Sequence, residues 1–193
     1  MGNCGAGRLM AHAFERSITG KIIGRLDAVE QALLRSLLQQ LAVLLHESDD
    51  GAAQDPIAQL VGIQDLAERP ADPALLRLFP DAYRDDEAAA NDFRRYTEVA
   101  LRAKKTSEAD AAIAILDRAD SKVELSEAEA KLMLAALNNT RLVLATRLGL
   151  TDETTLEQLL IAEQDSGGAA HLYEWLTWLQ ETLVRAVMRD ETN

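Results

Sequence analysis

The chain has 193 residues and a net charge of −12, and its composition is 48% hydrophobic and 27% charged. This balance is typical of a globular protein with a substantial core, and a chain of this length is most simply one domain, residues 1–193. No apolar run reaches the length of a membrane span, and the single cysteine, Cys4, excludes an internal disulfide, so we expect a cytoplasmic protein without a membrane segment.

Residues 12–26 predict a short N-terminal β-hairpin. Apolar and polar side chains alternate roughly on both sides of Thr19 and Gly20, which is the pattern of two strands joined by a turn. An isolated hairpin needs a larger surface to pack on. We expect residues 1–10, which precede it, to be disordered.

Residues 27–189 predict a helical bundle. Asp27 starts a helix with a leucine stripe, and Asp55 and Asp72 each cap a helix that has proline in its first position. The expected helices cover 27–46, 56–66, 73–79, a segment that starts near Asp85 and runs through Ala103, the central segment 126–148, 154–164 and 170–189. The helix from Asp85 either continues through Leu116, which we favour, or breaks at Thr106. Trp175 and Trp178 are expected to pack in the core against the central helix and 27–46.

The central segment, residues 126–148, has signals at both ends and an apolar middle. Ser126 and Glu129 form a capping box at its start, and Gly149 is where the chain leaves the helix. Leucines on most sides predict that the bundle is built around this helix.

A polar island of Asn138, Asn139 and Arg141 interrupts the apolar central helix. Buried polar groups need partners, so we expect Arg141 to be mostly buried and bonded to a carboxylate or a backbone carbonyl of another helix. The island is either such a polar network of the core, which we favour, or a site for an anionic ligand.

A basic run consists of Arg94, Arg95, Arg102 and Lys105. At 100° per residue these side chains share about a third of the helix circumference, opposite Phe93, Tyr96, Ala100 and Ala103. They are a candidate surface for a partner or for phosphate. Glu98 lies four residues from both Arg94 and Arg102, however, a spacing typical of ion pairs on a solvated helix face, and we favour that interpretation.

The sequence has no pattern of catalytic or metal-ligating residues. It contains no nucleophile elbow, phosphate-binding loop or zinc-ligand spacing, and its three histidines lie far apart. We therefore expect no enzymatic activity, no cofactor and no metal site.

Four blocks resemble an actinobacterial family of domains of unknown function that includes the actinomycete oxidative stress regulators. The blocks, in the family's order, are EQALLRSLLQQLAVLL (30–45), DPALLRLFPDAYRDDEAAANDFRRYTEVALRAKK (72–105), ELSEAEAKLMLAALNNTRLVLATRLGL (124–150) and YEWLTWLQETLVRAV (173–187). They cover nearly the whole chain after residue 25.

The resemblance implies a cytoplasmic regulator in thiol-linked transcriptional control. Genes of the family often lie beside that of the Clp protease adaptor, which implies a role in proteolysis instead. Redox sensing in the family is attributed to a Cys-x-x-x-Cys pair near the N-terminus. Here Cys4 is followed four residues later by Arg8, so this pair is absent.

Our interpretation is a non-enzymatic oxidative-stress transcriptional regulator that acts by binding a protein, such as a component of the transcription machinery. The alternatives are an adaptor in Clp-type protein turnover and a small-molecule-binding protein that uses Arg141. We expect no direct DNA binding without a partner, because an acidic chain repels the phosphate backbone. Only the segment 93–122 has more basic than acidic residues, seven against five. The sequence does not define the oligomeric state.

Overall fold

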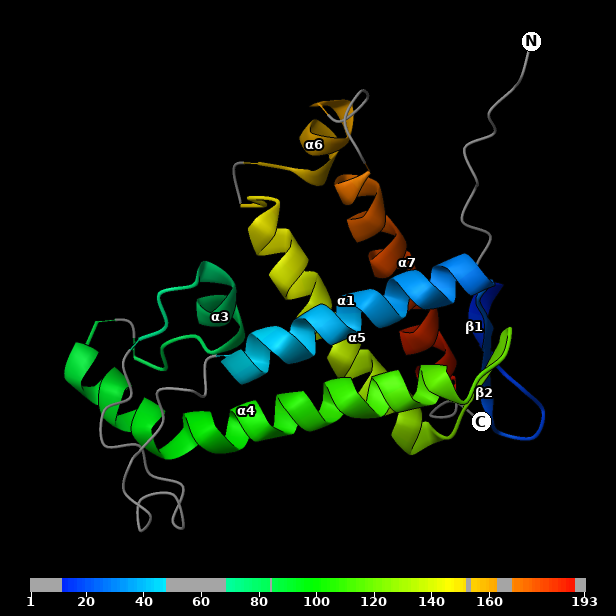
Figure 1. The fold of residues 1–193 in the computed structure, drawn as a ribbon, viewed down its shortest axis with the longest axis horizontal. Helices are drawn as coiled ribbons and strands as arrows, with labels where there is room; N and C mark the ends of the chain where they lie inside the picture. The colour runs from blue at the N-terminus through cyan, green and yellow to red at the C-terminus, as the bar shows by residue number, and fades with distance from the viewer. Residues whose placement is uncertain (1–11, 48–68, 84, 152–153, 163–167, 190–193) are drawn as a thin grey trace.

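The computed structural model describes residues 12–47, 69–83, 85–151, 154–162 and 168–189, and it is mainly helical with a small sheet at one end (Figure 1). The elements are β1 (His12–Arg16), β2 (Ile22–Arg25), α1 (Ala28–Glu47), α3 (Pro73–Leu78), α4 (Glu87–Asp117), β3 (Lys122–Leu125), α5 (Glu127–Arg147), α6 (Leu156–Ala162) and α7 (Ala169–Met188). The mainly α class with an N-terminal hairpin is confirmed. The expected helix at 56–66, the expected disorder at 1–10 and Cys4 lie outside the described residues, and the single domain stays a prediction.

The hairpin belongs to a three-stranded antiparallel sheet of order β1-β2-β3. The third strand, β3, pairs Leu125 with Ile22 and Lys122 with Arg25, a pairing that the sequence pattern does not predict. Four residues give too short an alternation to recognise, and their partner strand lies far away in the chain. At Gly24 a Cβ atom would lie 2.5 Å from the Phe14 ring, so this position needs glycine for the ring to pack on the strand.

The helix starts follow the local signals in the sequence. Ser126 and Glu129 form the expected capping box of α5, and the Asp72 side chain accepts from the backbone of Ala74 at the start of α3. Gly149 has a φ of 68°, the left-handed conformation that ends a helix. The helix α4 is continuous over 31 residues, as favoured, and does not break at Thr106.

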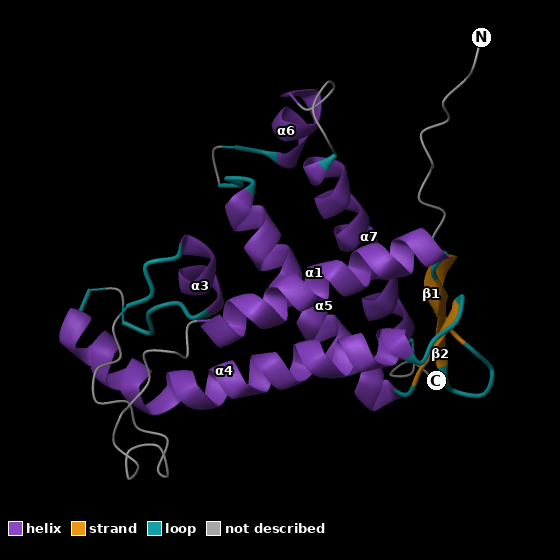
Figure 2. Cartoon of the chain, in the orientation of Figure 1, coloured by secondary structure: helices purple, strands orange, loops and turns teal. Residues whose placement is uncertain are grey.

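The bundle is built around α5, which contacts α1, α3, α4 and α7 (Figure 2). The larger core cluster joins the sheet to α1, α4, α5 and α7, and a smaller one joins α1 and α3 to Ala109 of α4. Trp175 lies in the larger cluster with 7% of its surface exposed, but Trp178 is 37% exposed. The prediction that both tryptophans lie in the core is wrong for Trp178, which lies at the edge of the buried stripe of α7 and is partly exposed. None of the described helices is long and apolar enough to cross a bilayer.

Candidate functional site

The side of α4 that faces the bundle carries a ladder of buried charges. Arg94, Glu98 and Arg102 are 5%, 7% and 7% exposed. Oε2 of Glu98 accepts from Nη1 of Arg94 at 2.7 Å, and Oε1 accepts from Nη2 of Arg102 at 2.5 Å. Arg94 also pairs with Asp81. Burial alone would lower the pKa of Arg94, but its bonds to Glu98 and Asp81 outweigh this and leave that pKa raised.

The ladder also satisfies the ends of two other helices. Nη1 of Arg102 donates to the carbonyl of Leu45, in the last turn of α1, at 3.2 Å. Nη1 of Arg94 donates to the carbonyl of Phe79, which follows α3, at 3.5 Å. The carbonyls at helix ends lack partners within their own helix, so buried arginines are well suited to this position. The guanidinium of Arg102 also lies 4.6 Å from the centre of the Phe79 ring.

The prediction that these arginines lie on a solvent-exposed face of the helix is therefore wrong for Arg94 and Arg102. Glu98 pairs with both arginines within the helix, Asp81 supplies a second carboxylate to Arg94, and the carbonyls of Phe79 and Leu45 accept from Arg94 and Arg102. Lys105 is half-buried and donates to Oδ1 of Asn139 at 2.7 Å, and burial lowers the pKa of Lys105. Arg95 is also half-buried and lies 3.7 Å from Asp92. The four basic residues do not form one exposed surface.

The opposite side of α4 is apolar and faces outward. Phe93 and Tyr96 are 48% and 61% exposed, and Ala100 and Ala103 continue the same stripe as exposed residues. Tyr83 packs edge-on against Phe93, with the ring centres 6.3 Å apart. We call these five residues the aromatic face. The buried ladder fixes its orientation, because turning the helix would expose the charged side and remove the arginines from the carbonyls that they bind.

The polar island of α5 is divided among different environments. Asn138 is exposed, whereas Asn139 is buried and accepts the bond from Lys105. Arg141 is half-buried and donates to side chains of α7: Oγ1 of Thr177 at 3.1 Å, Oε1 of Gln180 at 2.8 Å and the hydroxyl of Tyr173 at 3.2 Å.

Arg141 thus contacts another helix, as expected, but the expected partner type is wrong. Its partners are neutral side chains rather than a carboxylate or a backbone carbonyl. The two acidic residues of α7, Glu174 and Glu181, are exposed on a different side of that helix. Only the fold determines which flank of α7 meets Arg141.

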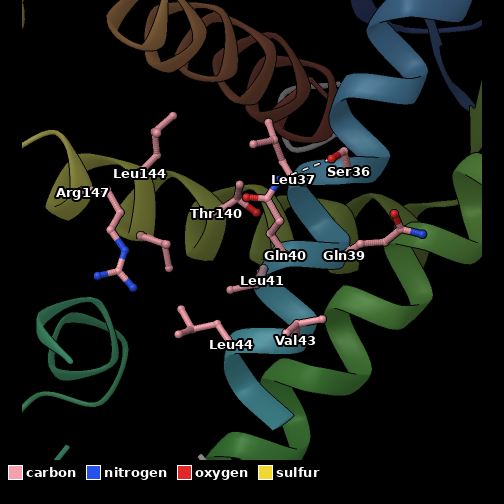
Figure 3. Close-up of a pocket in the computed structure, with 11 residues that line it drawn as sticks. Ser36, Leu37, Gln39, Gln40, Leu41, Val43, Leu44, Thr140, Leu144 and Arg147 are labelled. Carbon is pink, nitrogen blue, oxygen red and sulfur yellow. Dashed lines mark hydrogen bonds between the residues drawn. The ribbon is translucent and has the colours of Figure 1, made fainter. Parts of the chain in front are cut away.

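A groove of about 450 Å³ lies between α1 and α5 (Figure 3). Its walls are mainly apolar, with Leu37, Leu41 and Leu44 from α1 and Leu144 from α5. Arg147 lies at its edge and donates to Oδ2 of Asp72 at 2.5 Å. Arg141 does not line this groove, so the groove and the polar island are separate features.

Among the described residues, no group of three or more His, Cys, Asp or Glu side chains is placed to hold a metal ion.

Comparison with known proteins identifies relatives over almost the whole chain. Residues 11–187 match the family described as a domain of unknown function, DUF2017. Two relatives named oxidative stress regulator AosR, in Mycobacterium bovis and Mycobacterium tuberculosis, are each 33% identical over 173 residues, which is 82% of this chain and 78% of theirs. An AosR relative in Mycobacterium leprae is 34% identical over 82% of this chain and 79% of its own length. No solved structure matches the chain.

Proposed function

The chain belongs to the DUF2017 family, and we propose that it is a non-enzymatic cytoplasmic regulator of the oxidative-stress response that binds another protein through the aromatic face. The names of its mycobacterial relatives support the regulatory role. The observation that carries the mode of action is the outward orientation of Phe93 and Tyr96. Aromatic side chains are enriched at protein interfaces, and contiguous exposed apolar patches mark interaction sites.

A protein partner fits the charges of the chain better than DNA does. Non-specific DNA affinity comes mainly from Lys and Arg side chains that contact phosphates. The one segment with an excess of basic residues has two of its arginines, Arg94 and Arg102, buried against Glu98. In a chain of net charge −12, this leaves no strong basic face on α4 for a phosphate backbone.

The favoured partner is a component of the transcription machinery, and the alternative is a component of Clp-type protein turnover. Either partner would bind the same aromatic face, because both roles require protein binding and neither requires a catalytic reaction. A role in binding a small molecule has a separate candidate, the groove between α1 and α5, whose volume lies within the range of ligand sites.

Affinity capture from the native host tests this proposal. The full chain is used as bait in three forms: wild type, Tyr96→Glu and the control Ile161→Glu, which changes an exposed apolar residue of α6. We expect wild type and control to retain a transcription component that Tyr96→Glu loses. Loss of a proteolytic component instead would favour the adaptor role. Equal capture by all three forms would contradict docking through the aromatic face.

A further inference from the structure

The aromatic face is self-complementary, and we propose that it binds a second copy of this chain through an antiparallel, two-fold pair of α4 helices. The inference rests on the proposed function in one respect, namely that the aromatic face is a contact surface. It adds that one molecule bound there is a second copy of this chain.

The spacing of the face is that of a helix-pairing seam. Phe93, Tyr96, Ala100 and Ala103 alternate three and four residues apart and lie within about 80° of the helix circumference. Figure 1 shows α4 as a long outer helix, with α1 alongside it and α5 crossing behind it. The exposure of Phe93 and Tyr96 places the seam on the outer side, where a second helix can approach.

The order of large and small residues along the seam selects the antiparallel arrangement. When the two-fold axis passes midway between Tyr96 and Ala100, Tyr96 faces Ala100 of the second copy. The same axis places Phe93 against Ala103 of the second copy. Each such facing pair contains one aromatic ring and one alanine, so the two helix axes stay at a constant distance.

A parallel pair would pack poorly with the same residues. It would place ring on ring at Phe93 and Tyr96 and methyl on methyl at Ala100 and Ala103. One end of the pair would then be held apart while the other left a gap, and both defects weaken packing.

The charges beside the seam are compatible with a second copy of an acidic chain. The seam itself has no charged residue. Lys104 lies on the same flank as Phe93, so the two-fold axis brings its ammonium group beside the Phe93 ring of the second copy, a cation–π arrangement. Its contact within the helix, to Glu108, is long at 3.9 Å, which leaves the ammonium able to reorient.

The available area predicts a weak dimer. Phe93, Tyr96 and Tyr83 are each about half exposed, so covering them removes about 100 Å² per ring. Alanines and flanking side chains bring this to roughly 600 Å² per copy, or about 1,200 Å² in total, the lower end of specific interfaces. We therefore expect a dimer that forms with rising concentration, and a partner protein on the same face would compete with it.

The test is the mass of the full chain in solution, measured by sedimentation at protein concentrations of about 1 to 200 μM, a range that brackets the weak affinity expected of so small an interface. Reducing conditions ensure that Cys4 cannot link two chains. Tyr96→Ala leaves alanine against alanine, and Ala100→Tyr leaves ring against ring. We expect each to weaken dimerisation at least about tenfold. The double variant Tyr96→Ala/Ala100→Tyr restores one ring and one alanine in each facing pair and should recover most of the affinity. Ile161→Ala, an exposed change on α6, is the matched control.

Recovery by the double variant is the decisive result, because only self-pairing in this register predicts it. A monomer at every concentration, a dimer unaffected by either single change, or a double variant as weak as the single ones would each overturn the proposal. The two proposals fail separately. If the chain is monomeric but Tyr96→Glu still loses a captured protein, the proposed function stands and self-association alone is wrong.

Discussion

Replacing Glu98 by glutamine tests the buried charge ladder that orients α4. The change keeps the size of the side chain and its helix propensity, and it removes the charge shared by Arg94 and Arg102. Removing one partner of a buried ion pair costs about 3–5 kcal/mol, because an uncompensated charge stays buried. Arg94 keeps its pair with Asp81 and Arg102 keeps the Leu45 carbonyl, so we expect the lower end, about 3 kcal/mol.

Urea unfolding followed by circular dichroism measures this loss as a change in the free energy of unfolding. In a thermal scan the same loss lowers Tm by roughly 6–12 °C for a chain of this size. The control is Glu181→Gln, which breaks an exposed pair with Arg185 and should cost no more than about 0.5 kcal/mol. If Glu98→Gln unfolded like the control, the ladder would not be a buried, mutually dependent set of charges.

Three further predictions use the same unfolding measurement. Trp175→Ala should lower the free energy of unfolding by roughly 3–5 kcal/mol, and Trp178→Ala by clearly less, because 37% of the Trp178 surface is already exposed against 7% for Trp175; equal losses would contradict the placement of α7. Arg141→Met should cost about 1–2 kcal/mol, since its lost partners are neutral and half-buried; a loss above about 4 kcal/mol would indicate a buried carboxylate partner. The hydrogen bond from Arg147 lowers the pKa of Asp72 below its ordinary value, so the folded state binds fewer protons there than the unfolded state. The ion pair therefore stabilises the fold at pH values above the ordinary pKa of Asp72, and this stabilisation is lost as the pH falls through the lowered pKa of the folded state. Arg147→Gln should destabilise the protein at pH 7 and have little effect near pH 2. An equal loss of stability at both pH values would contradict this.

The helix boundaries could be predicted because their signals are local. The Ser126 and Glu129 side chains bond to backbone groups within the same turn, and Asp72 does the same at the start of α3. The strand β3 was missed because Leu125 finds its partner, Ile22, about a hundred residues earlier in the chain. A four-residue strand has too little pattern of its own to be recognised.

The orientation of α4 could not be read from its amphipathic pattern. That pattern assigns charged residues to solvent and aromatic residues to the core. The reverse holds here because Glu98 and Asp81 together balance the charges of the two arginines, and the carbonyls of Leu45 and Phe79 accept from them. The spacing of Glu98 was visible in the sequence, but the carbonyls come from other helices and depend on the fold. The same dependence explains Arg141, whose bonding partners follow from the flank of α7 that it meets.

Hydroxyl-radical footprinting of the dilute full chain tests the orientation of α4 most directly. It compares side chains of one type, Phe93 on the aromatic face with the buried Phe79 and Phe14. We predict that Phe93 and Tyr96 are oxidised rapidly, that Phe79 and Phe14 are protected, and that protection of Phe93 and Tyr96 rises with protein concentration. If Phe93 were as protected as Phe79 at every dilution, α4 would bury its apolar side, and the aromatic face would not be a contact surface.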